Sequence, residues 1–208
     1  MEITKTDIID RVKCRMEELT PQWEGNFEQT EGVSIERYIN EIIDEQLRIL
    51  YMTAPTAILP VEEVASQHKP TKRTDGTGRI VLNDNVLRPI SLQLDGWERP
   101  VTRFIDENHP LYELQFNRYT RGGVVNPVAS LISDGLGRMV IDYFSLPTSR
   151  QVHTLSSLLC ILHPAAQADS YNLNPLLIDA LCYRCAATVY DIMGNNAMAQ
   201  TMQSHVEL

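Results

Sequence analysis

The segment LRPISLQLDGWERPVTRF, residues 87–104, alternates apolar and polar side chains on both sides of an Asp-Gly pair. Alternation with a period of two is typical of a β-strand that buries one face. Asp-Gly between two such runs is typical of the two-residue turn of a β-hairpin. We therefore expect a hairpin at Asp95-Gly96, in which Leu92 lies opposite Arg99.

Similar strand patterns precede and follow this segment, separated by turn signals such as Asn-His-Pro, Arg-Gly-Gly and Asp-Gly-Leu-Gly. The expected strands cover residues 79–82, 88–94, 97–104, 111–119 and 138–144. Together they predict a meandering antiparallel sheet that is curled or packed as a small sandwich. Residues 67–78, QHKPTKRTDGTG, hold almost no apolar side chains and are expected to form a flexible, locally basic loop before the sheet.

Helical patterns flank the strand region at both ends of the chain. Ser34 and Asn174-Pro175 stand where helix N-caps are expected, and Gly194 stands where a helix would end. The expected helices cover residues 3–19, 35–54, 154–162, 175–193 and 195–206. The order of helices, strands and helices predicts an α+β protein: a helical bundle formed by both ends of the chain (residues 1–60 and 151–208), with an inserted antiparallel β-region (residues 61–150).

The composition is that of a globular protein, with 43% hydrophobic residues in a chain of 208. A net charge of −9, from 27 acidic and 18 basic residues, argues against broad adhesion to nucleic acid or to anionic membranes. Charges interrupt the amino-terminal segment, and no apolar run approaches the roughly 20 residues that span a bilayer. We expect a soluble protein, made in a cytoplasm, that has no membrane partner.

The most suggestive chemical motif is the pair Cys182 and Cys185, in a C-x-x-C spacing. A redox pair lies at the exposed start of a helix, and a zinc site needs two further ligands at similar spacing. This pair falls two turns inside an expected helix, Cys14 and Cys160 are isolated, and the five histidines show no ligand pattern. We interpret the pair as small buried residues, and we expect no metal, no cofactor and no enzymatic activity.

Basic and aromatic residues recur along the expected strands and in the loop before them. In the expected hairpin Arg99 lies among apolar side chains, which suits a guanidinium that packs on a protein surface better than one in a duplex-binding stripe. The residues expected at a protein interface are Arg88, Trp97, Arg99, Arg103, Arg118, Tyr119, Arg121, Lys69, Lys72 and Arg73.

Several phrases of the sequence together resemble a known family. They are SIERYINEIIDEQLRILYMTAPTAILP, VLRPISLQLDGWERPVTR, YELQFNRYTRGGVVNPVASLI, GRMVIDYF and NPLLIDALCYRCAATVYDIMGN, in this order along residues 8–195. Their arrangement resembles the head-to-tail adaptor or connector (ring or collar) proteins of short-tailed bacteriophages, especially those of crAss-like phages of Bacteroidales. The resemblance implies a helical bundle that docks on the portal and an inserted β-region that faces neighbouring subunits and the next tail component.

The resemblance therefore implies a structural virion protein. Its copies would form a closed ring, commonly dodecameric in that class, between the portal and other neck or tail proteins, in passing contact with the packaged DNA. It would reside in the host cytoplasm during assembly and then in the virion neck. An alternative hypothesis is a cytoplasmic binding or regulatory module whose β-insertion captures a peptide or small ligand. A third is a thiol or metal enzyme that uses Cys182 and Cys185.

Overall fold

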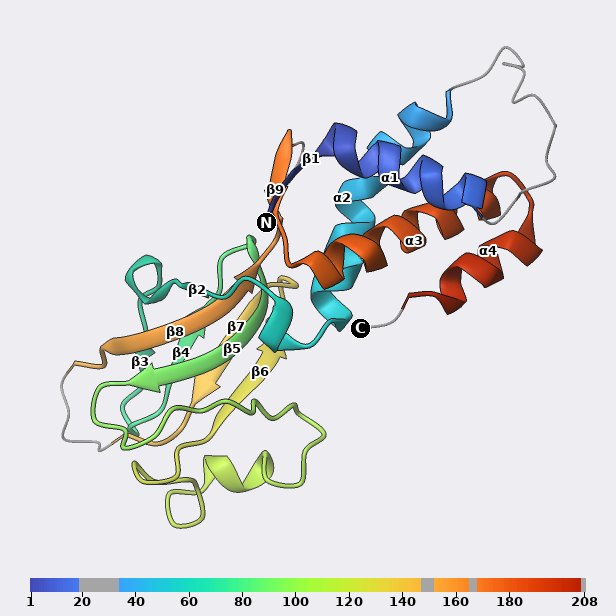
Figure 1. Cartoon of the computed structure of the whole chain (residues 1–208). Helices are drawn as coiled ribbons and strands as arrows, with labels where there is room; N and C mark the ends of the chain where they lie inside the picture. Colours follow the sequence, from blue (N-terminus) through green and yellow to red (C-terminus); the bar gives the residue numbers. More distant parts are fainter. Residues whose placement is uncertain (19–33, 147–151, 165–167, 207–208) are drawn as a thin grey trace. The chain divides into compact units, whose positions relative to one another are not determined.

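A computed structural model describes residues 1–18, 34–146, 152–164 and 168–206, and the chain divides into two compact units. The helical unit comprises Met1–Pro60 and His163–Leu208, and the β unit is Val61–Leu162 (Figure 1). The α-helices lie in the helical unit and the two larger antiparallel sheets lie in the β unit, which confirms the α+β class. No helix within the described residues is long and apolar enough to cross a membrane.

The helical unit is built around α3 (Pro175–Ile192), which packs against α1 (Lys5–Glu18), α2 (Ile35–Thr53) and α4 (Asn196–Ser204). A short 3-10 helix, η1 (Thr56–Ile58), follows α2. The side chains at helical spacing form the core of this unit. Its fully buried members include Ile8, Val12, Ile39, Ile43, Leu47, Leu50, Leu181 and Cys185.

The helix ends follow the local signals in the sequence. The Ser34 side chain accepts a hydrogen bond from the Arg37 amide, and the Asn174 side chain accepts one from the Leu176 amide. Such bonds satisfy amide donors that have no partner inside the helix. Gly194 has a φ of +77° just after α3, a conformation that glycine adopts without steric cost. The expected caps at these three positions are confirmed.

The first helix starts two residues later than expected, because residues 2–4 form a strand. Strand β1 (Glu2–Thr4) pairs antiparallel with β9 (Ser170–Asn172) and buries Ile3 between two exposed neighbours. Lys5 Nζ lies 3.2 Å from Asp44 Oδ2 on α2, and the Tyr171 hydroxyl donates a hydrogen bond to the same carboxylate. The pairing of β1 with β9 and the bond from Tyr171 to Asp44 join the two distant segments of the helical unit.

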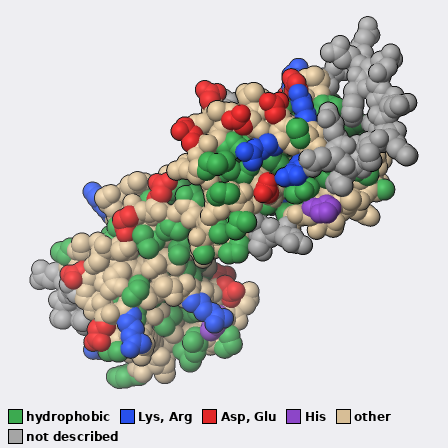
Figure 2. All heavy atoms as spheres, viewed as in Figure 1, with side chains coloured by type: hydrophobic (Ala, Val, Ile, Leu, Met, Phe, Trp, Pro, Cys, Tyr) green, Lys and Arg blue, Asp and Glu red, His purple; other side chains and the backbone are tan. Residues whose placement is uncertain are grey.

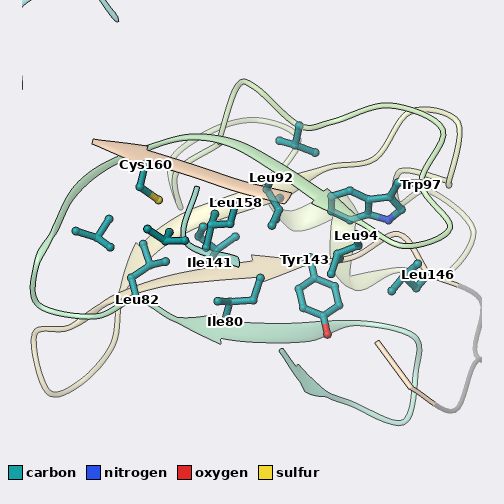
Figure 3. Close-up of a cluster of buried hydrophobic side chains, with 14 residues drawn as sticks. Ile80, Leu82, Leu92, Leu94, Trp97, Ile141, Tyr143, Leu146, Leu158 and Cys160 are labelled. Atoms are coloured by element: carbon teal, nitrogen blue, oxygen red, sulfur yellow. The ribbon is translucent and has the colours of Figure 1, made fainter. Parts of the chain in front are cut away.

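In the described residues, the β unit contains two antiparallel sheets. One has the strand order β2 (Glu62–Glu63), β8 (Leu155–Leu162), β5 (Val86–Leu94), and the other has the order β3 (Thr71–Lys72), β4 (Gly78–Val81), β7 (Met139–Tyr143), β6 (Ala129–Ser133). The strands expected at residues 79–82, 88–94 and 138–144 are confirmed with small shifts. The sheets enclose one apolar core, in which side chains from both sheets meet (Figure 3): Ile80, Leu82, Leu92, Leu94, Ile141, Tyr143, Leu158 and Cys160.

The short helix expected at residues 154–162 is wrong, because this segment is strand β8, which pairs along most of β5. Cys160 and Ile161 are neighbours on opposite faces of the strand, and both are fully buried. A strand that is buried on both faces has a continuous run of apolar residues, and a short buried helix has the same sequence pattern. The β unit consequently continues to Leu162 and does not end at residue 150.

The strand expected at residues 97–104 is also wrong. The chain turns at Gly96, whose φ is +95°, and the Trp97 amide donates to the Leu94 carbonyl at 3.1 Å. The next residue to meet β5 is Val101, which exchanges two backbone hydrogen bonds with Leu92, so Arg99 is not the partner of Leu92. The intervening residues leave the ladder because the Trp97 indole enters the core, where its Nε1 donates to the Ser145 carbonyl at 2.9 Å.

Residues 67–78, expected as a flexible loop, are folded. The short 3-10 helix η2 (Ala65–Gln67) leads into them, and β3 pairs with β4 across a tight turn. His68 is buried: its Nδ1 lies 2.9 Å from the Val64 carbonyl, and its Nε2 accepts the Asn83 amide at 3.1 Å. Backbone partners thus hold a segment that lacks apolar side chains.

Candidate protein-interaction site

A long excursion between β5 and β6 carries an exposed apolar segment, which we call the arm (residues 111–121). The strand expected at residues 111–119 is wrong, since the arm contains only the 3-10 helix η3 (Glu113–Phe116). Figure 1 shows η3 away from the carboxyl end of β8, where the chain leaves the β unit. The apolar side chains of the arm that solvent reaches are Leu111 (45% exposed), Leu114 (43%), Phe116 (55%) and Tyr119 (93%).

Internal hydrogen bonds hold the arm in shape. The buried Gln115 side chain donates to the Leu111 carbonyl and accepts the Gly122 amide, both at 3.0 Å. The Thr120 hydroxyl donates to the Leu114 carbonyl at 2.7 Å, and the Asn117 side chain accepts the Tyr119 amide at 3.0 Å. These bonds use the backbone groups that a strand would need for a ladder, so the arm is a compact loop with its apolar tips outside.

The arm also packs on the sheet beneath it through aromatic rings. The Phe116 ring meets Tyr112 and Phe144 edge to face, with ring centroids 5.1 and 5.7 Å apart. Phe144 is almost fully buried, whereas half of Phe116 faces solvent. Phe116 is therefore fixed along one edge and presents the other outward.

Arg121 anchors the base of the arm to the turn between β3 and β4. Its Nη2 donates to the Asp75 carbonyl at 2.6 Å, and its Nη1 lies 3.7 Å from the Asp75 carboxylate. Burial raises the pKa of Asp75, but hydrogen bonds from Thr77 and the charge of Arg121 outweigh this effect and leave the pKa below its ordinary value. Only 10% of the Arg121 side chain is exposed, so this arginine has a structural role in the chain.

One residue expected at the interface, Trp97, is buried, and Arg121 is only partly exposed. Trp97 is 5% exposed and packs edge to face on Tyr143, with ring centroids 6.4 Å apart. Because a side chain inside the core cannot reach a partner, the expectation that Trp97 forms contacts is corrected, whereas the role of the partly exposed Arg121 at an interface stays a prediction. The sequence alone does not indicate whether the ring of Trp97, which follows the turn, points into the core or toward solvent.

The other expected interface residues lie nearer the surface, and their role stays a prediction. Lys69, Arg99, Arg103, Arg118 and Tyr119 are exposed, Arg88 and Lys72 are half-buried, and Arg73 extends toward Asp142, with Nη2 3.8 Å from Oδ2. The arm brings Arg118 and Tyr119 together with Leu114 and Phe116. Leu114 and Phe116 were not among the expected interface residues, because their alternation with polar residues indicated a strand with one buried face.

A second surface feature is a groove of about 450 Å³ between α3 and α4, which we call the α3/α4 groove. Its lining is partly apolar and partly amide or hydroxyl, and includes Ala187, Thr188, Asp191, Ala199, Gln200 and Gln203. Asp191 is exposed, and among the described residues no donor or cation contacts its carboxylate. The groove therefore carries an available negative charge.

The C-x-x-C pair lies in the core of the helical unit. Cys182 and Cys185 are at most 1% exposed, and burial raises the pKa of both thiols, that of Cys182 to about 11. Both are therefore protonated at neutral pH, the state in which a thiol is a poor nucleophile and metal ligand. Within the described ranges, no three His, Cys, Asp or Glu side chains are grouped as a metal site requires.

The net charge of the chain belongs to one of its two units. The segments of the helical unit contain 16 acidic and 7 basic residues, a net −9, whereas the β unit contains 11 of each. Figure 2 shows acidic side chains spread over the helical unit, with a few Lys and Arg side chains among them, and side chains of both charges on the β unit. The two units therefore offer surfaces of different electrostatic character.

No family model matches this chain, and no curated protein matches it either. A functional assignment therefore depends on the arm, the groove and the distribution of charge, together with the resemblance in sequence. Of these features, the arm has the side-chain composition typical of a protein contact, because Tyr and Arg are enriched at binding hot spots.

Proposed function

We propose that this chain is a structural subunit of the head–tail connector of a short-tailed bacteriophage. In this role its copies assemble as a closed ring between the portal and the tail, around the DNA channel. The observation that carries the proposal is the arm, on which the 93% exposed Tyr119 stands beside Arg118 and the half-exposed Phe116. Exposed aromatic and arginine side chains on one loop with a fixed backbone are typical of a contact surface that a partner covers.

Two unlike surfaces on one chain favour a ring. A subunit in a cyclic assembly contacts one neighbour with one surface and the other neighbour with a different surface. The arm of the neutral β unit and the acidic faces of the helical unit supply such a pair. Complementary charge on the two surfaces would also favour the correct orientation of neighbouring subunits.

The charge of the chain is compatible with a channel for DNA. Proteins that hold duplex DNA do so mainly by placing lysine and arginine on its phosphates. A helical unit with a net charge of −9 does not attract phosphates, so a wall made from it would let the genome pass.

Assembly of the full chain tests the proposal directly. We expect the chain, mixed with the portal protein encoded in the same genome, to form rings in negative-stain electron microscopy and an oligomer in light scattering. A chain that remains monomeric with the portal protein at every concentration contradicts the proposal. A monomer that instead binds a peptide or small ligand would support the alternative binding module.

A further inference from the structure

We infer that Tyr119 and Arg118 on the arm of one copy dock in the α3/α4 groove of a second copy, where Arg118 pairs with Asp191. This inference rests on the proposed function, since it names the contact that joins neighbouring subunits. It commits to a second copy of this chain as the occupant of the groove. The chemistry of the two surfaces, their charge and their rigidity support it.

The groove suits a tyrosine side chain. A phenol is apolar over its ring and polar at its hydroxyl, so it favours a site that is dry at one end and hydrogen-bonding at the other. The methyl groups of Ala187 and Ala199 supply apolar wall, and the side chains of Gln200 and Gln203 supply donors and acceptors. A volume of about 450 Å³ leaves room for the ring and for part of the neighbouring arginine.

The charges of the two surfaces are complementary. Arg118 is exposed on the arm, and among the described residues no carboxylate contacts its guanidinium. The Asp191 carboxylate in the groove likewise has no donor or cation partner in the part of the chain that the structure describes. An arginine and a carboxylate that meet at an interface form a charge-assisted, often bidentate, hydrogen bond. The excess of acidic residues in the helical unit favours the approach of an arginine-bearing arm.

Both surfaces are held in shape before they meet. The arm is fixed by Gln115, Thr120 and Asn117, as described above. Helix α4, one wall of the groove, is anchored by the fully buried Met202 and by the Asn195 cap. The backbone of each surface is thus fixed before binding, so binding orders mainly the side chains that meet.

The contact is heterologous, because arm and groove are different surfaces of the same chain. Each copy has one arm and one groove, so each binds two neighbours, and the assembly closes when the rotation between neighbours divides a full turn. A contact between two arms would stop at a dimer. A copy thus binds two neighbours through a heterologous contact, but only one through an arm-to-arm contact.

Charge reversal in the full chain tests the pairing. We expect Arg118→Asp and Asp191→Arg, each alone, to weaken self-association at least tenfold in sedimentation velocity, and the double variant to recover it. Arg48→Asp is the matched control, since Arg48 is an exposed arginine on α2 outside the arm. Single variants that associate as the wild type does, or a double variant that stays as weak as the single ones, overturn the inference.

A mixing experiment tests the direction of the contact. Tyr119→Asp removes the tyrosine ring that is proposed to enter the groove, and Gln200→Trp places a large side chain in the groove at an exposed position. Each variant alone should be monomeric, whereas an equimolar mixture should give a dimer and nothing larger, because one intact arm and one intact groove remain. Circular dichroism first establishes that both variants are folded. A mixture that stays monomeric overturns the inference.

The outcomes separate this inference from the proposed function. If the wild-type chain forms rings with the portal protein and the Arg118 and Asp191 variants form them equally well, the arm contact is wrong and the connector function stands. If the wild-type chain never assembles, the proposed function fails, and the arm contact fails with it.

Discussion

Arg79 and Asp142 form a bidentate ion pair across β4 and β7, with Nε–Oδ1 at 2.6 Å and Nη2–Oδ2 at 2.7 Å. The two residues are directly opposite in the ladder, and Asp142 is 3% exposed. The hydrogen bond to Asp142 is the main cause of the raised pKa of Arg79. This pair stabilises the sheet beside the turn to which Arg121 anchors the arm.

Loss of the Asp142 carboxylate should destabilise the β unit. Asp142→Ala leaves the partly buried Arg79 without its partner, and we expect the free energy of unfolding to fall by about 2–4 kcal/mol. Urea unfolding followed by circular dichroism measures the change. Asp84→Ala removes the same charge from an exposed turn and should cost under about 0.5 kcal/mol. Equal effects of the two substitutions would show that the pair contributes nothing.

Gly78 should tolerate no side chain. A Cβ at this position would lie 2.1 Å from the Tyr143 hydroxyl oxygen and 2.6 Å from the Thr71 carbonyl oxygen. We expect Gly78→Ala to lower the melting temperature by several degrees, at a cost of about 1–3 kcal/mol. Gly123→Ala is the matched control, because a Cβ there meets nothing within 4 Å. An unchanged melting temperature for Gly78→Ala would contradict the packing of β4 on Tyr143.

Glu63 should make stability depend on pH. Burial raises the pKa of Glu63, but hydrogen bonds from the Ser157 hydroxyl and the Leu158 and Ala65 amides outweigh it and lower the pKa below 4.5. A lowered carboxyl pKa stabilises the folded state above pH 4.5, and this stability is lost as the pH falls through the folded-state pKa.

The difference in unfolding free energy between the wild type and Glu63→Gln should therefore be largest near neutral pH and shrink below pH 4.5. Glu62→Gln makes the same change at the neighbouring residue and is the control. A difference that stays constant with pH would be inconsistent with the lowered pKa.

One thiol of the four should react quickly in the native chain. Cys14 is exposed, whereas Cys160, Cys182 and Cys185 are buried. Burial raises the pKa of the Cys160 thiol to about 12. We expect a thiol reagent at neutral pH to modify Cys14 alone, and all four after unfolding. Rapid modification of Cys182 or Cys185 in the folded chain would instead favour the thiol-enzyme hypothesis.

The sequence predicted elements whose signals are local. Ser34 and Asn174 cap their helices because a short polar side chain can bond a nearby amide in any fold. Strands β4, β5 and β7 were predicted because each is a short run rich in apolar residues that turn signals bound. These signals do not depend on distant segments of the chain.

The sequence failed where a distant segment decides the structure. The apolar residues of β8 alone indicate a short helix, and only their pairing with β5 makes this segment a strand. Likewise, Asp95-Gly96 alone indicates a regular hairpin, but burial of the Trp97 ring takes the following residues out of the ladder. Strand β6 was not predicted from the sequence. Its structure depends on two partners, β7 on one side and Ile105 on the other. The arm was misread for a similar reason, since Gln115 satisfies the backbone groups that would otherwise form a ladder.

The most direct test of the connector function is negative-stain electron microscopy of the full chain with the portal protein encoded in the same genome. The proposal predicts closed rings of this chain seated on the portal, with a mass in light scattering that matches many copies. A portal that remains bare, beside a chain that stays monomeric at every concentration, would contradict it.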